Sequence, residues 1–332
     1  MNVAIIGAGL IGAKRAGAVV ENSDLKLVCD LDSKRAEELA EKYKSDFCLD
    51  YNEIVSYDDI NTVIVATTNE YLAPISVASL RAGKHVLCEK PLGRNSSESL
   101  EIVDAAKAAG KIVKTGFNHR FHPAIMKAKQ LVDFREIGSI INIRARYGHG
   151  GRSGYENEWR CDKEISGGGE LLDQGVHLID LCRWFSGDVK EVYGKTLTTF
   201  WPIEVEDNAF FLLNHKNDVI SQCHVSWTNW KNIFSFEIFG TRGFIHIEGL
   251  GGSYGVETLI VGKRNANGGA PSIETESFPG PDESWRLEWE NFVLAIKNNK
   301  TPNGSLKDGV ETNRVVDAIY ESSRLNKSVF LT

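Results

Sequence analysis

The first twenty residues constrain the fold of this chain more than any other stretch. Residues 3–6 are apolar and run into Gly7, Gly9 and Gly12, spaced as G-x-G-x-x-G, ahead of an alanine-rich helical segment at 13–20. Gly7 suits a tight turn, Gly9 lets the backbone approach a pyrophosphate, and Gly12 lets helix and strand pack closely. The helix N-terminus then offers N–H groups to the phosphates. The predicted cofactor-binding residues here are Gly7, Gly9, Leu10, Ile11 and Gly12.

A second apolar run, residues 25–29, ends in an acid. Asp30 lies 18 residues beyond Gly12, against about 20 for the acid that binds a ribose in dinucleotide sites. A carboxylate there accepts hydrogen bonds from the adenosine ribose hydroxyls and repels a 2′-phosphate. The sequence therefore predicts NAD as the cofactor, with NADP less favoured.

Two observations leave alternatives open at this acid. Lys34 and Arg35 lie just downstream and are able to face a phosphate. Asp30 also has a purely structural alternative, as the N-cap of the helix that begins near Ser33, although Asp32 suits that cap equally well.

Strand and helix signals then alternate through about residue 118. Residues 62–66 form a β-branched run that leads into Thr67, Thr68 and Asn69, so we expect Thr67 and Asn69 near the ribose or nicotinamide. Further helices are predicted at 75–82 and 96–109, and further strands at 85–88 and 111–115, the last as the sixth strand. This alternation indicates α/β architecture with a doubly wound parallel sheet.

The strand at 85–88 delivers Glu89, Lys90 and Pro91 to its carboxyl end, the edge at which open α/β sheets bind ligands. Pro91 disfavours a helical conformation at Lys90. We therefore predict that Lys90 faces a cleft, and that Glu89 and Lys90 contribute to the cofactor site. The alternative is a solvated lysine in a surface loop.

Length and composition limit the remaining possibilities. A chain of 332 residues suits two domains, expected at 1–118 and 119–332. A net charge of -7 argues against a nucleic-acid or acidic-membrane partner, and no apolar run is long enough to span a membrane. Six cysteines without a CxxC pair indicate reduced core residues of a cytoplasmic protein, with no metal site expected.

After residue 118 the pattern changes mostly to strands. Residues 234–238 and 245–248 alternate between apolar and polar side chains, which is typical of a sheet with one buried face. We predict an α+β domain with a large open, mainly antiparallel sheet. Its strands are expected at 141–147, 191–198, 208–214, 219–227, 233–239, 244–247 and 256–261, and its helices at 124–134, 283–298 and 307–325.

Aromatic residues concentrate in this predicted sheet. They offer more apolar surface than one or two helices can cover, which favours self-association as a homodimer or homotetramer. The alternative is that they fill the interior of the monomer. The residues concerned are Trp201, Trp227, Trp230, Phe234, Phe236 and Phe239.

A glycine run at 167–169 precedes a second cluster of polar residues. Asp173 and His177 are four apart on a predicted amphipathic helix and therefore share one face, with Asp180 close by. An imidazole beside a carboxylate can handle protons near neutral pH; the alternative is an ordinary helix-surface pair. Metal binding is the weaker option because no third ligand stands at a telling spacing.

The segment at 147–160 is expected to rim the substrate cleft. Arg152 and Arg160 suit a diphosphate, and Tyr155 and Trp159 suit stacking on a sugar or base, which favours a nucleotide-linked sugar. Neighbouring acids offer both arginines surface partners, so a free sugar or cyclitol stays equally open. These acids are Glu156, Glu158, Asp162 and Glu164. The candidate substrate-binding residues are Asn118, Arg120, Arg152, Tyr155, Trp159, Arg160, Asp173 and His177.

Three motifs together resemble the family of glucose-fructose oxidoreductase, inositol dehydrogenase and the rhizopine-catabolism protein MocA. They are the G-x-G-x-x-G start, the segment at 82–91, and Gly168-Gly169 followed by Asp173, Gly175, His177 and Asp180. The likeness covers essentially the whole chain. It implies an N-terminal Rossmann domain, a C-terminal domain whose open sheet is used for oligomerisation, and oxidation or reduction of a sugar or cyclitol carbon.

Carried over by residue, Lys90 matches the family's catalytic lysine, and Asp173 and His177 match its substrate-binding and proton-transfer pair. Members often have Thr-Pro-Asn-x-x-His where this chain has residues 67–72, so that loop contributes no histidine. We expect His177 to take or relay the hydroxyl proton, Lys90 to steady the alkoxide and Asp173 to orient both. A sugar-sensing regulator that binds NAD without turnover is the alternative function, disfavoured because a sensor needs no proton-transfer set.

Overall fold

The computed structural model describes residues 1–331, apart from the side chain of Val55. The chain forms two compact units. Unit 1 comprises Met1–Asn118, Glu164–Gly167 and Trp285–Asn313, and unit 2 comprises His119–Lys163, Gly168–Ser284 and the residues from Arg314 on. Two segments that follow residue 118 in the chain therefore complete the unit that contains the N-terminus.

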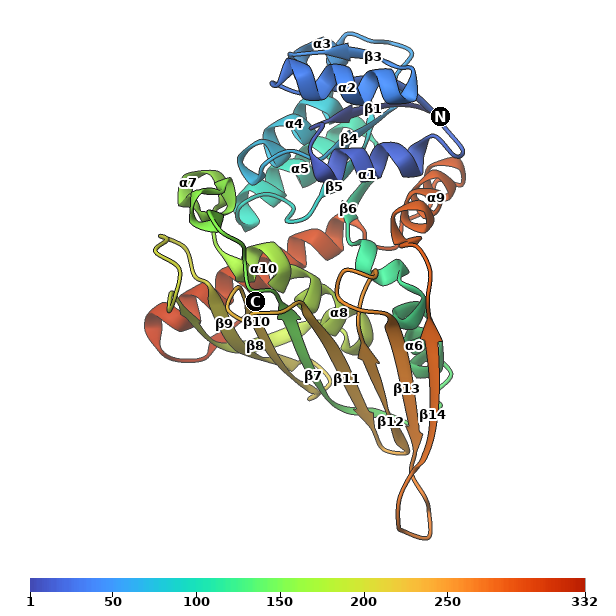
Figure 1. Ribbon diagram of the computed structural model, residues 1–332, viewed down its shortest axis with the longest axis vertical. Helices are drawn as coiled ribbons and strands as arrows, with labels where there is room; N and C mark the ends of the chain where they lie inside the picture. The colour runs from blue at the N-terminus through green and yellow to red at the C-terminus, as the bar shows by residue number, and fades with distance from the viewer. Residues whose placement is uncertain (332) are drawn as a thin grey trace. The chain divides into compact units, whose positions relative to one another are not determined.

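Unit 1 contains a six-stranded sheet with the order β3-β2-β1-β4-β5-β6, and every pairing in it is parallel. The predicted doubly wound parallel sheet is confirmed (Figure 1). The three-residue strand β3 is the one that the sequence pattern did not locate. The strands are β1 Asn2–Ile6, β2 Asp24–Cys29, β3 Asp46–Cys48, β4 Thr62–Val65, β5 His85–Glu89 and β6 Val113–Gly116.

Helices pack against both faces of this sheet. On one face α1, α2 and α9 bury apolar side chains against Val3, Ile5 and Ile64, and α9 adds Trp289 and Phe292 to that cluster. On the other face α3, α4, α5 and the first turns of α10 cover the alternate residues of the same strands. The helices are α1 Leu10–Val19, α2 Ser33–Tyr43, α3 Tyr51–Val55, α4 Asn69–Arg81, α5 Ser96–Ala109, α9 Ser284–Lys297 and α10 Leu306–Leu325.

Local capping accounts for where several of these helices begin and end. The Asp32 side chain accepts hydrogen bonds from the backbone N–H groups of Lys34 and Arg35 at the start of α2. The Asn95 side chain accepts a hydrogen bond from the Glu98 backbone N–H at the start of α5, and Gly110 ends α5 with a φ of 62°. Asn and Asp satisfy free N–H groups at helix starts, and glycine readily adopts the left-handed conformation at helix ends.

Unit 2 contains a nine-stranded sheet with the order β14-β13-β12-β11-β7-β10-β9-β8-β15. Its pairs are antiparallel except β7 with β10, so the predicted mainly antiparallel sheet is confirmed. Strands β14 and β15 were not predicted. The strands are β7 Ile140–Gly148, β8 Val189–Leu197, β9 Asn208–His215, β10 Ile220–Ser226, β11 Ile233–Gly240, β12 Gly243–Glu248, β13 Glu257–Lys263, β14 Ser272–Phe278 and β15 Val329–Phe330.

Helices α6 (Pro123–Asp133) and α8 (Val176–Ser186), with the second part of α10, pack on one face of this sheet and form the core of unit 2. The aromatic residues divide between the two possibilities left open above. Trp227, Phe234 and Phe236 are buried, whereas Trp230 is 62% exposed.

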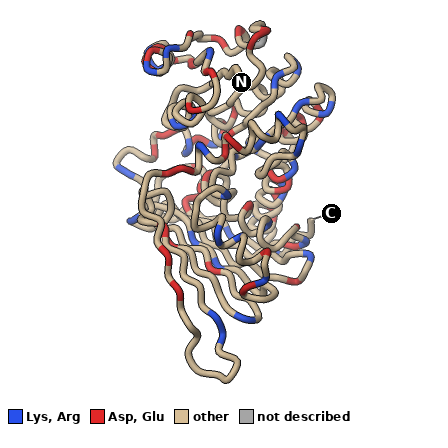
Figure 2. The backbone as a smooth tube through the Cα atoms, turned by 90° about the vertical axis from the view of Figure 1, so that its right-hand side faces the viewer, with Lys and Arg blue, Asp and Glu red and all other residues tan. Residues whose placement is uncertain are grey.

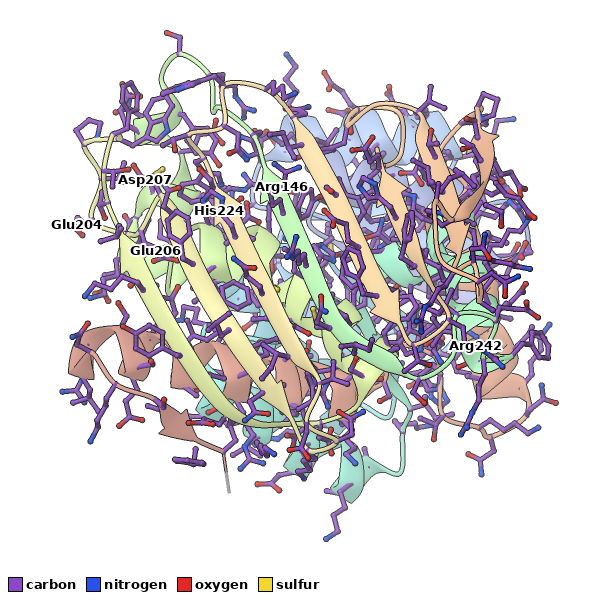
Figure 3. All side chains as sticks on the ribbon, turned by 90° about the horizontal axis from the view of Figure 1, so that it is seen from below. Arg146, Glu204, Glu206, Asp207, His224 and Arg242 are labelled. Atoms are coloured by element: carbon purple, nitrogen blue, oxygen red, sulfur yellow. The ribbon has the colours of Figure 1, made fainter. Side chains whose placement is uncertain are left out.

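The opposite, uncovered face of the nine-stranded sheet is called the outer face here. It carries apolar side chains among polar ones: Phe210 and Leu212 on β9 are 47% and 43% exposed. In Figure 3, Arg146 and His224 lie side by side on this face, from the neighbouring strands β7 and β10. The outer face is therefore mixed in character.

Charged residues of both signs are interspersed along the chain (Figure 2). The six cysteines are free and buried. Across residues 1–331, no helix combines the length and apolar character needed to cross a membrane.

Candidate active site

The glycine loop after β1 is closed to side chains at two positions and open at the third. A Cβ on Gly7 would lie 2.3 Å from the Ala66 carbonyl oxygen, and one on Gly12 would lie 1.8 Å from the Gly7 carbonyl oxygen. A Cβ on Gly9 would meet no atom within 4 Å. Gly9 is the N-cap of α1 and has no capping side chain, so this helix start offers backbone N–H groups, at Leu10 and Ile11, beside open space.

Asp30 follows β2 and faces this loop. Its Oδ2 accepts a hydrogen bond from the Ala8 backbone N–H at 2.6 Å, and its Oδ1 accepts from Asp32 N–H at 2.9 Å. The cap of α2 is supplied by the Asp32 side chain, so Asp30 does not serve as that N-cap. A carboxylate beside an open glycine loop and an uncapped helix start fits a dinucleotide, with the pyrophosphate at the loop and the ribose at Asp30.

Lys90 is half-buried and follows β5 directly. The residue before it is engaged elsewhere: the Glu89 carboxylate accepts from Arg15 Nε at 2.6 Å. Arg15 also donates to Glu288 at 2.6 Å, and Lys114 lies 3.3 Å from Glu288. Burial raises the pKa of Glu89 above its ordinary value, while Arg15 and, more weakly, Lys90 oppose that shift. The Glu89 carboxylate is therefore part of a buried ion cluster.

Two polar residues after β4 were predicted near the ribose or nicotinamide. Asn69 is the first residue of α4, is buried, and donates from Nδ2 to the Ser166 carbonyl oxygen at 2.8 Å. Thr67 donates from its hydroxyl to the Thr68 carbonyl oxygen at 3.2 Å. The Asn69 amide therefore joins two chain segments within unit 1.

In unit 2, His177 lies in the second position of α8 and is stacked on His119. The ring centroids are 3.6 Å apart with an interplanar angle of 14°, and both residues are 5% exposed. His119 Nε2 lies 3.1 Å from the Tyr147 hydroxyl. His119 was not predicted as a site residue, although its neighbours Asn118 and Arg120 were selected from the same polar turn.

Asp173 lies in a π-helical turn, η4 (Leu171–Gly175), which directly precedes α8. Its carboxylate is 3.3 Å from Arg160 Nε, and Arg160 is also 3.5 Å from Glu158. Burial opposes the charge on Arg160, but Asp173 raises the pKa of Arg160 above its ordinary value. The predicted substrate residues Asp173 and Arg160 therefore form an ion pair with each other.

Arg120 lies in the 3₁₀ turn η1 (Asn118–Phe121) and makes a two-pronged ion pair with Asp180. Nε and Nη2 of Arg120 lie 2.8 Å and 2.6 Å from the two carboxylate oxygens, and both side chains are buried. Arg120 was predicted to bind substrate, whereas its guanidinium here joins η1 to α8. Asn118 begins the same turn and is buried.

The residues predicted to rim the substrate cleft differ in their surroundings in the structure. Tyr155 is buried in a small core with Cys161, Val205 and Trp227, so its ring is packed inside unit 2. The Arg160 guanidinium lies 4.6 Å from the centre of a Trp159 ring. Arg152 is exposed and pairs with Glu158 at 2.6 Å.

Among the described residues, no three His, Cys, Asp or Glu side chains gather in a way that would hold a metal ion.

Comparison with known proteins gives matches to two family models. Residues 1–117 match the oxidoreductase family with an NAD-binding Rossmann fold, and residues 125–246 match the GFO/IDH/MocA C-terminal domain. The chain belongs to the GFO/IDH/MocA oxidoreductase family. It is thus an NAD(P)-dependent oxidoreductase, and the family resemblance predicted from the motifs is confirmed.

Curated relatives within this family cover nearly the whole chain. Levoglucosan dehydrogenase from Pseudarthrobacter phenanthrenivorans is 26% identical over 97% of this chain and 96% of its own length. D-xylose 1-dehydrogenase (NADP(+)) 2 from Haloferax volcanii is 25% identical over 100% of both chains. The structure of levoglucosan dehydrogenase in complex with NADH superposes with a TM-score of 0.91 at 26% identity, covering 100% of this chain and 99% of that one.

Proposed function

We propose that this protein is an NAD-dependent dehydrogenase that transfers a hydride between nicotinamide and a secondary alcohol or ketone carbon of a free sugar or cyclitol. The observation that carries the proposal is the presence of Lys90 directly after β5 together with His177 held in a buried ring stack. A sensor that only bound its ligand would need neither group.

Each side chain has a separate task in this reaction. The Lys90 ammonium stabilises the negative charge that develops on the substrate oxygen. His177 accepts the hydroxyl proton during oxidation and returns it during reduction. Asp173, ion-paired with Arg160, presents a carboxylate that orients the substrate hydroxyls. When bound, the nicotinamide supplies the hydride acceptor, and the protein supplies position and proton transfer.

The environment of Asp30 supports NAD over NADP. The basic residues that could face a 2′-phosphate have acidic partners on their own helix: Lys34 lies 3.8 Å from Glu38, and Arg35 lies 3.4 Å from Asp32. An Asp30→Gly variant is expected to lose roughly 10- to 100-fold in affinity for NAD, the cost of charge-assisted hydrogen bonds to the ribose. Calorimetric titration with NAD and NADP tests this, and unchanged NAD affinity would contradict it.

The arginines of the 151–162 segment support a free rather than a nucleotide-linked substrate. Arg152 pairs with Glu158, and Arg160 pairs with both Glu158 and Asp173. With two acids neutralising two bases, little positive charge remains to attract a diphosphate. The relatives are named for sugars without a nucleotide, levoglucosan and D-xylose among them.

A thermal-shift screen in the presence of NAD tests the proposal directly. The compounds are free sugars, anhydrosugars, inositols, and UDP-, GDP- and dTDP-sugars. We expect stabilisation by a compound of the first three classes, followed by its NAD-dependent oxidation in an absorbance assay for reduced nicotinamide. Stabilisation without turnover would favour the sensor, and stabilisation only by sugar nucleotides would contradict the substrate class.

We also propose self-association, as a homodimer or homotetramer, through the outer face of the nine-stranded sheet. The exposed Phe210 and Leu212 on β9 supply apolar surface that a second copy would cover. Light scattering after size-exclusion chromatography is expected to give a multiple of 36.8 kDa. A Phe210→Glu, Leu212→Glu double variant is expected to reduce it to the monomer mass; a monomeric wild-type protein would contradict the proposal.

A further inference from the structure

We infer that His119 is a positioning residue for His177: its ring, stacked face to face on the His177 imidazole, fixes the plane of that imidazole and separates the two proton-binding steps of the pair. The inference rests on the proposed function for its catalytic meaning, although the ring pair itself can be tested without any substrate.

The geometry of the two rings supports this role. Their centroids are 3.6 Å apart and their planes differ by 14°, so the rings lie over one another and their nitrogens point outward from the edges. When one ring is protonated to imidazolium, protonation of the other becomes harder, because two positive charges at this separation in a buried site repel strongly. Two sites that interact in this way titrate in separate steps that belong to the pair.

A hydrogen bond at the edge of the His119 ring fixes the position of that ring. Its Nε2 lies 3.1 Å from the Tyr147 hydroxyl, and the Tyr147 ring packs edge-on against Phe234 at 5.4 Å and lies 5.0 Å from Tyr254. Gln174 donates to the Tyr254 hydroxyl at 2.7 Å. Burial, with a further contribution from Tyr254, raises the pKa of Tyr147 well above its ordinary value. Tyr147 therefore remains a neutral partner wherever the histidines titrate.

The charged groups around the two rings favour binding of a first proton by the pair, but they do not remove the repulsion that a second proton would meet. Asp173 and Glu170 act on the buried hydroxyl of Tyr147 and add negative charge to this region. Arg160 partly offsets Asp173 through their ion pair. The other titratable groups form local pairs, His122 with Glu257 and Arg120 with Asp180. The His122 ring lies edge-on to His119 with centroids 5.6 Å apart, whereas the centroids of His119 and His177 are 3.6 Å apart, so the strongest repulsion between imidazoles is the one between the stacked rings.

For catalysis this means that His177 starts neutral and oriented. A fixed ring plane keeps the accepting nitrogen aimed at the substrate hydroxyl, and small errors in such positioning cost large factors in rate. Once the pair holds one proton, at lower pH, His177 no longer accepts another. The acid limb of the pH profile is therefore expected to report the pair and not one histidine.

The decisive experiment is a nuclear magnetic resonance titration of protein labelled only at histidine, without substrate. His119→Phe keeps a flat ring and removes the second proton site, whereas His119→Gln removes the ring and keeps a hydrogen-bonding group for Tyr147. A His177→Gln variant identifies the signal. An internal control exists: His224 is stacked on the neutral Phe210 ring at 4.0 Å and 7°, so it is expected to titrate in one step.

In the wild-type protein we expect two steps for the pair, separated by more than about one pH unit. In both His119 variants His177 is expected to titrate in a single step, as His224 does. An unchanged His177 titration in both variants would overturn the inference. Once a substrate is known, His119→Gln is expected to lower kcat by roughly 10- to 100-fold with unchanged KM for NAD, and His119→Phe to restore most of kcat.

The two proposals fail separately. If His177→Gln leaves turnover unchanged, the catalytic role of His177 is wrong, although the coupled titration can still be observed. If His177→Gln abolishes turnover while the His119 variants keep the wild-type titration and acid limb, the proposed function stands and the role of His119 is wrong.

Discussion

Arg15 and Glu89 form an ion pair in which both side chains are buried, with Arg15 Nε 2.6 Å from Glu89 Oε1. Glu288 and Lys114 extend this pair into a cluster that joins α1, β5, β6 and α9. Burial opposes the charge on Arg15, but Glu288 and Glu89 raise its pKa above the ordinary value. Since Lys90 follows Glu89 directly, the cluster anchors the backbone that carries the lysine.

Removal of Arg15 is expected to destabilise unit 1 strongly. Arg15→Met leaves Glu89 and Glu288 buried with Lys114 as their remaining basic partner, and breaking a buried ion pair costs about 3–5 kcal/mol. The matched control is Lys34→Met, whose pairing with Glu38 is on the surface and contributes at most about 1 kcal/mol. Denaturant unfolding measures both, and similar midpoints for the two variants would contradict the structural importance of the cluster.

Substitution of Lys90 tests its electrostatic role. Lys90→Met keeps an unbranched, flexible side chain and removes the ammonium group, so turnover is expected to fall by about 10²- to 10³-fold, while the dissociation constant for NAD changes little. Lys107→Met, on the exposed side of α5, serves as the control. Steady-state kinetics and NAD titration give the two quantities; a Lys90→Met enzyme with normal turnover removes the lysine from the mechanism.

Two glycine substitutions are expected to fail in different ways. Gly9→Ala places a methyl group in open space, so the protein should fold normally and lose NAD affinity, since the added carbon occupies the pyrophosphate approach. Gly12→Ala places the same methyl 1.8 Å from a backbone oxygen, so the melting temperature itself should drop. Thermal melts with and without NAD distinguish the two effects. Equal apo melting temperatures would contradict the close packing at Gly12.

Acid is expected to destabilise the fold through buried histidines such as His215. Burial lowers the pKa of His215 below the ordinary 6.5, while His215 contacts the Gly187 carbonyl and the Ser221 hydroxyl. The unfolded chain then binds more protons than the folded one below about pH 6.5, so stability falls as the pH is lowered through that range. The pKa values of His85, His149 and His224 are shifted in the same direction.

A His215→Gln variant removes one of these proton-binding sites. Its melting temperature should be lower than wild type at pH 8, because two hydrogen bonds change, but it should depend less on pH between 8 and 5. The unfolding free energy that is lost between pH 8 and pH 5, measured by denaturant unfolding, should be smaller than in the wild type by up to roughly 1.4 kcal/mol for each unit of the lost pKa shift. His246→Gln, on the outer face, provides the comparison. A wild-type slope in His215→Gln would contradict the assignment.

Local signals in the sequence were sufficient for most elements of the fold. Helix α5 occupies Ser96–Ala109 as predicted, because its Asn cap and terminal glycine are both contiguous with it. Strand β14 escaped prediction because its residues are almost all exposed, so no alternation between a buried and a solvent face marks it. Strands β3 and β15 contain three and two residues, too few for any periodicity.

In the candidate site, too, features set by neighbouring residues could be predicted, whereas contacts between distant residues could not. The glycine loop and Asp30 could be predicted because neighbouring residues define them. The partners of Arg120 and Asp173 could not, since Arg120 meets Asp180 across 60 positions and Asp173 meets Arg160 from a separate loop. The burial of Tyr155 could not be predicted either, because its ring packs against Val205 and Trp227, which lie far along the chain. His119 stands between the predicted residues Asn118 and Arg120, but its stack on His177 joins residues far apart along the chain and gave no local signal.

The contribution of Trp285–Asn313 to unit 1 has a consequence for how the chain is made. A ribosome synthesises the first 118 residues long before Trp289 and Phe292, which complete the cover that α1 and α2 provide over Val3, Ile5 and Ile64. During synthesis, one face of the Rossmann sheet therefore keeps part of its apolar surface exposed until α9 has been made, and chaperones act on such exposed apolar surface.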